Sequence, residues 1–173
     1  MRKILLPLLM GFIAQFTFAQ DVTIIDHEST ATTSTFQFFG GAIEGQISEV
    51  IANPNPSGIN TSAMVGEFLK VTDSPVWGGG FSDVPVVMDF TNGATEICVK
   101  VHVDHTTPIL LKLEGSTTGG PDWEKQETTT VVNDWEEICW TVDGAAIGHI
   151  YPRLTLFFDW DIVPATDQIY YFF

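Results

Sequence analysis

The chain is poor in basic residues, with seven Lys and Arg against 22 Asp and Glu among 173 residues, so its formal net charge is −15. This excess of negative charge repels phosphate groups, which argues against nucleic acids and anionic membrane surfaces as partners. Neutral ligands and a bound cation remain compatible with the charge. The acidic residues also keep an exported protein soluble without any ligand.

Cysteine is scarce as well, which limits the metal chemistry that the chain can support. The two cysteines are Cys98 and Cys139, and no CxxC motif or nearby cluster of histidines accompanies them. They therefore do not form a zinc site by themselves. In an oxidising compartment an even number of cysteines favours a disulfide.

Long apolar runs are absent except at the start of the chain. Residues 4–18 are nearly all apolar, two basic residues precede them, and the small Ala19 follows. This pattern predicts a cleaved signal peptide over residues 1–19, because the run is too short and wrongly flanked for a membrane span. No cysteine follows the run to carry a lipid anchor, so we expect no membrane insertion.

Cleavage after Ala19 would leave residues 20–173, which are enough for one exported domain with a hydrophobic core. It would remove two of the seven basic residues and none of the 22 acidic ones, and would bring the formal net charge to −17. We find no internal repeat and no linker in this part of the chain. The sequence therefore predicts a single secreted domain.

Convincing amphipathic helices are also absent, and what is present instead is one short strand pattern after another. Apolar and polar residues alternate over 97–104 and again over 109–114, so each segment has one buried and one wetter face. Such strands form two sheets that pack face to face. Strands are predicted near 22–28, 34–39, 46–52, 63–72, 85–90, 95–104, 108–114, 126–132, 135–142, 150–158 and 168–173.

The segment NPNPSGINTS, residues 53–62, is rigid and polar between two apolar runs. Pro54 and Pro56 cannot donate to a strand ladder, and Gly58 permits a positive φ. We expect a rigid connection between two strands. Its polar atoms could bind an ion or cap the edge of the sandwich, and a purely structural loop is the favoured interpretation.

Carboxylate pairs give little support to a hydrolase. Glu136 and Glu137 are adjacent on a strand and point to opposite faces, whereas Asp159 and Asp161 share a face or a turn. A glycosidase needs two carboxylates across a cleft, but close acidic residues are expected by chance in so acidic a chain. A small glycoside hydrolase is therefore only a distant alternative for the function.

Other catalytic motifs are missing too. His102 and His105 are three residues apart on a strand, which places them on different faces, and no third metal ligand accompanies them. The chain has no G-x-S-x-G motif, and the glycines of WGGGFSDV are not followed by the Lys-Ser or Lys-Thr of a phosphate loop. We assign no catalytic residue.

Seven segments, in order along the chain, carry a resemblance to a known family. They are IIDHE, FFGGAIEGQISEVIANPNPSGINTSAMVGEFLK, VWGGG, VKVHVDHTTPILLKLEG, DWEEICWTVD, LTLFFDWD and IYYFF. The chain resembles the galactose-binding-like domains of secreted bacterial polysaccharide-degrading enzymes, which are carbohydrate-binding modules. The resemblance implies an all-β fold, an antiparallel β-sandwich of jelly-roll type, and a glycan as partner.

The resemblance also implies a structural Ca²⁺ ion, held by an acid in the first strand and another in the last. Glu28 matches the first acid, but the aspartate expected after the paired tyrosines has no counterpart before the chain stops at Phe173. We therefore expect the closing strand, 168–173, to pair near the first strand and to be short. Its apolar end would be a C-terminal edge strand through which copies associate. The stop also fits a piece of a longer protein.

We also expect a disulfide between Cys98 and Cys139. Both residues lie on the face opposite the apolar residues of their strands, and in a jelly roll those strands can be neighbours in one sheet. In the chain-entropy model such a bridge stabilises the fold by roughly 3–4 kcal/mol.

The tryptophans are the best indication of a ligand, because the apolar faces of sugars stack on flat rings while polar neighbours bind the hydroxyls. Trp123 and Trp160 lie where periodicity does not assign them to the core, and Trp77 precedes three glycines. Lys112 and Glu114 lie on the wetter face of a strand, where they can donate to and accept from hydroxyls. We predict a non-catalytic glycan-binding module, with a structural or adhesive domain as the alternative.

Overall fold

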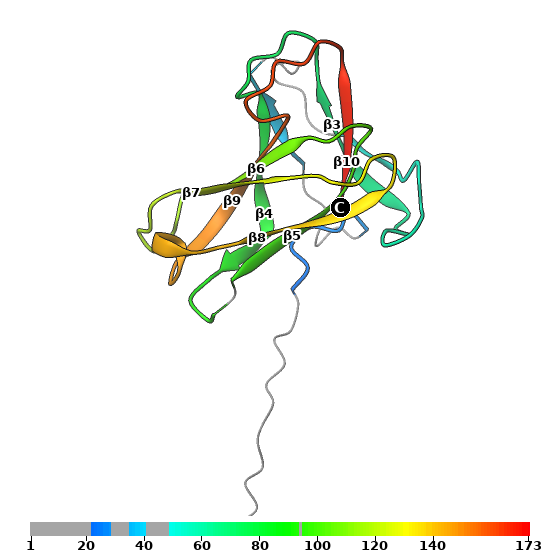
Figure 1. Ribbon diagram of the computed structural model, residues 1–173. Coiled ribbons are helices and arrows are strands. Elements are labelled where there is room, and N and C mark those ends of the chain that lie inside the picture. The colour runs from blue at the N-terminus through cyan, green and yellow to red at the C-terminus, as the bar shows by residue number, and fades with distance from the viewer. Residues whose placement is uncertain (1–21, 29–34, 41–48, 94) are drawn as a thin grey trace, which may run out of the picture.

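The computed structural model describes residues 22–28, 35–40, 49–93 and 95–173 (Figure 1). The predicted signal peptide, residues 1–19, lies outside the described residues. Residues 22–28, predicted as the first strand, are irregular, so that prediction is wrong. The reason lies partly at His27, whose φ of 56° is incompatible with an extended strand.

The described residues form ten strands and one short 3₁₀ turn, η1, at Gly144–Ala146. The strands are β1 (Gln37–Phe39), β2 (Glu49–Ala52), β3 (Met64–Lys70), β4 (Gly79–Asp89), β5 (Glu96–His102), β6 (Pro108–Glu114), β7 (Trp123–Thr128), β8 (Trp135–Thr141), β9 (Ile150–Phe158) and β10 (Gln168–Phe172). In this part of the chain no helix has the length and apolar character needed to span a bilayer.

The strands form two five-stranded antiparallel sheets that pack against each other. Sheet A has the order β1-β4-β9-β6-β7, and sheet B has the order β2-β3-β10-β5-β8. From β3 to β10 the chain changes sheet at every connection except the β6–β7 hairpin (Figure 1). This order is that of a jelly roll. The predicted fold class, an all-β antiparallel β-sandwich of jelly-roll type, is confirmed.

The core lies between the inner faces of the two sheets. In β6 the alternating residues Ile109, Leu111 and Leu113 are fully buried, and Val101 of β5 and Trp140 of β8 face them from sheet B. The predicted alternation in these strands is therefore confirmed. Every second residue of sheet A consequently points to the outer face of that sheet.

The closing strand, β10, is not an edge strand. It lies in the middle of sheet B, with Tyr170 opposite Phe68 of β3 and Tyr171 opposite His102 of β5. The edges of this sheet are β2 and β8. The predicted association through a C-terminal edge strand, and its predicted pairing with the first strand, are therefore wrong.

The physical reason for the central position of β10 is its apolar side chains. Tyr170 and Phe172 are buried in the core, whereas a position at the edge of the sheet would expose them to solvent. Phe172 fits because Gly66 lies opposite it on β3: a Cβ at Gly66 would stand 2.4 Å from the ring.

The predicted disulfide is confirmed. Cys98 of β5 lies directly opposite Cys139 of β8, with 4.1 Å between their Cα atoms and a bond between their sulfur atoms. The bridge joins the edge strand of sheet B to its neighbour, on the outer face of that sheet.

Residues 53–62 form the rigid connection that the sequence predicts, between β2 and β3. Within it, Ser57 and Asn60 pair as an isolated bridge, and the φ of Gly58 is 53°. The carbonyl oxygen of Asn55 accepts a hydrogen bond of 2.6 Å from Nε1 of Trp135, the first residue of β8. The connection therefore contacts the start of β8, the strand at the opposite edge of sheet B.

Candidate ligand-binding surface

The outer face of sheet A carries a cluster of aromatic side chains at one end. Phe39 of β1 and Phe157 of β9 point outward, because their neighbours Phe38, Leu156 and Phe158 are in the core. We call the cluster the aromatic surface; it consists of Phe39, Trp77, Phe81, Phe157 and Trp160.

Four rings of the aromatic surface contact one another in a row, in the order Trp77, Phe39, Phe157 and Trp160. The centroids of Phe39 and Phe157 are 5.6 Å apart, those of Phe157 and Trp160 5.0 Å, and those of Phe39 and Trp77 6.4 Å with nearly parallel planes. Phe157 is buried beneath its neighbours, whereas the side chain of Trp77 is 52% exposed. Trp77 therefore offers a free ring face at the rim of the cluster.

Glycines on β4 make room for these rings. A Cβ on Gly79 would stand 2.7 Å from the Phe157 ring and 2.8 Å from the carbonyl oxygen of Leu156. The sequence predicts a strand over residues 85–90, and its start is wrong because β4 begins at Gly79. Gly78 to Gly80 read as a turn in the sequence, but the last two belong to the strand and bring it close to β9.

A strip of polar residues continues the same face of sheet A beyond the aromatic surface. We call it the polar strip; it consists of Asp83, Lys112, Glu114, Asp122, Arg153 and Thr155. The Lys112 ammonium lies 2.9 Å from Glu114 and 3.3 Å from Asp122. Thr155, which is buried, donates its hydroxyl to the second oxygen of Glu114.

The two regions meet at Arg153. Its guanidinium lies 4.4 Å from the centroid of the Phe81 ring and donates two hydrogen bonds, of 2.7 and 3.1 Å, to Asp83. The bonds to Asp83 raise the pKa of Arg153, and they lower the pKa of Asp83. The hydrogen bond to Glu114 likewise raises the pKa of Lys112. The strip therefore presents paired, fixed charges beside the rings.

Trp160 belongs to a tight turn, residues 158–162, that follows β9. Asp159 and Asp161 both have positive φ, 49° and 64°, which folds the backbone back on itself. Trp160 donates its amide to the carbonyl of Pro108, and Asp161 donates its amide to the carbonyl of Val76. The second bond ties the turn to the loop that carries Trp77.

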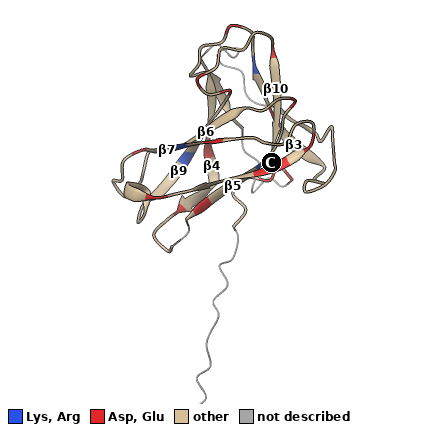
Figure 2. Ribbon diagram, in the orientation of Figure 1, with Lys and Arg blue, Asp and Glu red and all other residues tan. Residues whose placement is uncertain are grey.

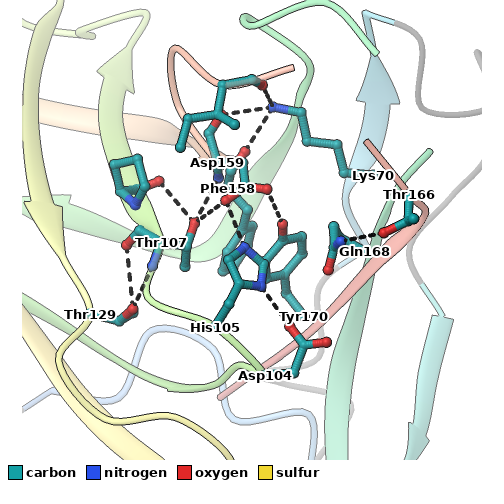
Figure 3. Close-up of polar contacts among 12 residues, drawn as sticks. Lys70, Asp104, His105, Thr107, Thr129, Phe158, Asp159, Thr166, Gln168 and Tyr170 are labelled. Atoms are coloured by element: carbon teal, nitrogen blue, oxygen red, sulfur yellow. Dashed lines mark hydrogen bonds and ion pairs between the residues drawn. The ribbon is translucent and has the colours of Figure 1, made fainter. Parts of the chain in front are cut away.

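A buried polar network underlies this turn (Figure 3). Asp159 is 2% exposed, and its carboxylate accepts hydrogen bonds from the hydroxyls of Thr107 at 2.6 Å and Tyr170 at 2.7 Å. Nε2 of His105 lies 3.0 Å from the same carboxylate, and Nδ1 lies 2.6 Å from Asp104. Asp159 therefore joins sheet A to sheet B at the end of the sandwich beneath Trp160.

The network shifts the acidity of its members. Burial alone would raise the pKa of Asp159, but the hydrogen bonds from Thr107, Tyr170 and His105 outweigh it and lower that pKa. Burial alone would lower the pKa of His105, but its two carboxylate partners raise it. Because carboxylates only accept, both ring nitrogens of His105 donate when the imidazole is protonated.

Four of the five predicted ligand-binding residues lie along this side of sheet A. Trp77 and Trp160 belong to the aromatic surface, and Lys112 and Glu114 belong to the polar strip. The fifth, Trp123 of β7, lies opposite Leu113 and packs against the core, so its side chain is on the other face of the sheet. Its Nε1 lies 3.4 Å from a carboxylate oxygen of Asp143.

Sequence reasoning missed Phe39, Phe81, Phe157 and Arg153. The signal for Phe157 was available in the segment LTLFFDWD, where Leu154, Leu156 and Phe158 alternate as core residues and leave Phe157 on the outer face. Nothing in the sequence alone places β1 and β4 beside β9, so the cluster itself was not predictable from alternation.

The predicted Ca²⁺ ligand, Glu28, accepts a hydrogen bond of 2.9 Å from the amide of Met64. Among the described residues, the grouped metal-type side chains are Cys98, Glu137 and Cys139, whose sulfurs are already bonded to each other. Among the described residues, Glu28 is therefore in no group of three such side chains, and Ca²⁺ binding stays a prediction.

The carboxylate pairs considered for hydrolysis are not arranged as facing pairs. Asp159 is engaged in the buried network, whereas Asp161 is exposed. Glu136 accepts hydrogen bonds from the backbone amides of Thr130 and Val131, and so holds the loop before β8.

Comparisons with known proteins find similarity among solved structures only. No family model and no curated protein matches the chain. Among solved structures, the chain is similar to the carbohydrate-binding module TmCBM61, described in complex with β-1,4-galactotriose. The TM-score is 0.46 and the sequence identity 15%, over 80% of this chain and 87% of that chain.

Proposed function

We propose that the protein is a non-catalytic module that binds a polysaccharide or oligosaccharide on the outer face of sheet A. The observation that carries the proposal is the exposed ring of Trp77, stacked on Phe39 at the rim of the aromatic surface and close to Trp160. A ring that is half exposed yet held rigidly by another ring is suited to stack on the C–H face of a sugar.

The polar strip supports the same function. Its donors and acceptors are fixed by mutual contacts, so they would lose little side-chain entropy on binding hydroxyl groups. Lys112 and Glu114 supply one donor and one acceptor next to each other. This pattern suits a neutral, hydroxyl-rich ligand.

The charge of the chain argues for the same class of glycan. Acidic residues outnumber basic ones over the whole described fold (Figure 2). A sulfated or uronic polymer would be repelled by this field, so a neutral or weakly charged glycan is the expected ligand. We further propose that the protein is exported, which the disulfide supports because such bonds persist in oxidising compartments.

Calorimetry with neutral β-glucans, mannans and galactans tests the proposal. Replacing Trp77 or Trp160 by Ala should weaken binding roughly tenfold, because each stacked ring contributes about 1–2 kcal/mol. Trp123→Ala is the matched control: it removes a ring from the same sheet but from its other face. We expect that variant to lose stability and to keep its affinity for the glycan.

Two results would contradict the proposal. If the wild type binds none of these glycans, a structural or adhesive function becomes the better explanation. The adhesive hypothesis rested on a C-terminal edge strand, however, and β10 lies in the middle of sheet B. If binding survives loss of Trp77 and of Trp160 but not of Trp123, the site lies elsewhere. The exchange Glu114→Gln adds a finer check, since it keeps the shape of the polar strip and removes one charge.

A further inference from the structure

Lys70, the last residue of β3, has no exposed surface. Its ammonium donates to the backbone carbonyls of Phe158 at 3.0 Å, Asp159 at 2.9 Å and Ile162 at 3.3 Å (Figure 3). An ammonium has three N–H donors, so these three bonds use all of them. No carboxylate takes part in these bonds.

The three carbonyls come from one short turn, residues 158–162. The positive φ values of Asp159 and Asp161 bend this turn so that its oxygens converge on one point. Convergent backbone carbonyls replace the hydration shell of a cation elsewhere in proteins. The turn thus supplies the oxygen ligands of a cation site, and the Lys70 ammonium takes the place of the cation.

We propose that the 158–162 turn is a monovalent-cation site whose ion is the Lys70 ammonium, and that this tethered cation fixes Trp160 for the ligand. The second half rests on the proposed function. The site suits an ammonium-type ion better than Ca²⁺, because the ammonium is held by three neutral oxygens, whereas Ca²⁺ takes 6–8 oxygen ligands that usually include carboxylates.

The connection to the ligand surface is short. Trp160 lies between two of the carbonyls that bind the ammonium, and the amide of Asp161 bonds to Val76, next to Trp77. Loss of the ammonium would remove one donor from each of the three carbonyls and would leave Asp159 with the amide of Ile162, so the turn would be less firmly held. Both tryptophans of the rim would then lose their fixed positions.

The first experiment uses the unmodified protein. In ¹⁵N NMR spectra, the Lys70 ammonium should exchange its protons slowly with water and show couplings across the hydrogen bonds to carbonyls 158, 159 and 162. Lys100, whose ammonium lies over the Phe173 ring on the outer face of sheet B, is the internal control and should exchange fast. Equally fast exchange at Lys70 would overturn the proposal.

The second experiment is chemical rescue of Lys70→Ala. The atoms removed by this change are those of n-propylammonium, so that ion should bind in the space and raise the melting temperature of the variant more than that of the wild type. The isosteric n-propanol, tested at equal concentration and ionic strength, should not. Rescue by both compounds, or by neither, would contradict a cation site. Lys70→Met, which keeps the unbranched chain except its last atom and removes the charge, should resemble the unrescued variant.

Glycan affinity separates the two halves of the proposal. We expect Lys70→Ala to bind at least tenfold more weakly than the wild type and to recover in n-propylammonium, whereas Lys100→Ala binds normally. Unchanged affinity in a destabilised Lys70→Ala would overturn the positioning role alone. If the wild type binds no glycan, the proposed function fails. The proton exchange of the Lys70 ammonium and the rescue of Lys70→Ala by n-propylammonium still decide whether the turn is a cation site.

Discussion

At the scale of single residues, His27 stands out as a buried group without polar partners among the residues that the structure describes. Its side chain is 3% exposed, neither ring nitrogen has a hydrogen bond among the described residues, and its edge meets the Phe172 ring at 5.5 Å between centroids. Burial lowers the pKa of His27, although the nearby Asp26 and Glu28 carboxylates oppose the shift. The folded protein therefore holds this imidazole neutral.

This arrangement predicts a loss of stability in mild acid. Because the pKa of His27 in the folded state is below its ordinary value of 6.5, its contribution is present above pH 6.5 and is lost as the pH falls through that value toward the folded pKa. His27→Phe keeps the ring contact and removes the titration. We expect the variant to gain about 1 kcal/mol, and to unfold in urea with less change between about pH 7 and pH 5.

Two observations would contradict this reasoning. One is a variant that loses stability in acid as steeply as the wild type. The other is an NMR titration that finds the His27 ring charged in the folded state at neutral pH. His105 serves as the comparison in the same titration, because the pKa of that residue is raised by Asp104 and Asp159.

At the scale of elements, the strand β8 depends on the disulfide. It is an edge strand of sheet B that pairs with β5 alone in that sheet, and Cys139 bonds to Cys98 across the pair. The bridge closes a loop with a sequence separation of 41 residues, which in the chain-entropy model stabilises the fold by roughly 3–4 kcal/mol.

Replacing Cys98 and Cys139 together by Ala should therefore lower the free energy of unfolding by about that amount. Hydrogen exchange should accelerate first in β8, since an edge strand has one neighbour to hold it. Val99→Ala on the same strand, β5, is a useful control for simple loss of packing. Equal stability of the double variant and the wild type would show that pairing with β5 suffices.

The element scale also shows how far sequence reasoning reaches. β6 and β9 were predicted with correct ends, because alternation is a local property of the chain. The central place of β10 was not predictable, since it depends on which distant strands flank it, and the glycines that open β4 read locally as a turn. The core contact of Trp123 was not predictable from its turn-rich segment either, because it follows from the pairing of that residue with Leu113 in the β6–β7 hairpin.

At the scale of the whole molecule, the formal charge of −15 acts against the folded state. Compact packing brings like charges together, and salt screens the repulsion between exposed charges that are farther apart than the Debye length, about 10 Å at 0.1 M. The melting temperature should therefore rise between about 10 mM and 0.3 M NaCl. Binding of a neutral glycan should change little over the same range.

The comparison needs a control for general salt effects. A variant in which several exposed acids are replaced by their amides, such as Glu124→Gln and Asp143→Asn, should gain less from added NaCl. A melting temperature that falls with salt in the wild type would mean that attractive pairs such as Arg153–Asp83 outweigh the repulsion.

The central place of β10 also determines when the sandwich can form. A ribosome delivers β3 and β5 well before residues 168–172, and until then sheet B consists of a β2–β3 pair and a β5–β8 pair with no strand between them. Tyr170, which completes the buried Asp159 network, arrives just as late. Without β10 the chain therefore lacks the strand that joins the two halves of sheet B and the hydroxyl that completes the Asp159 network.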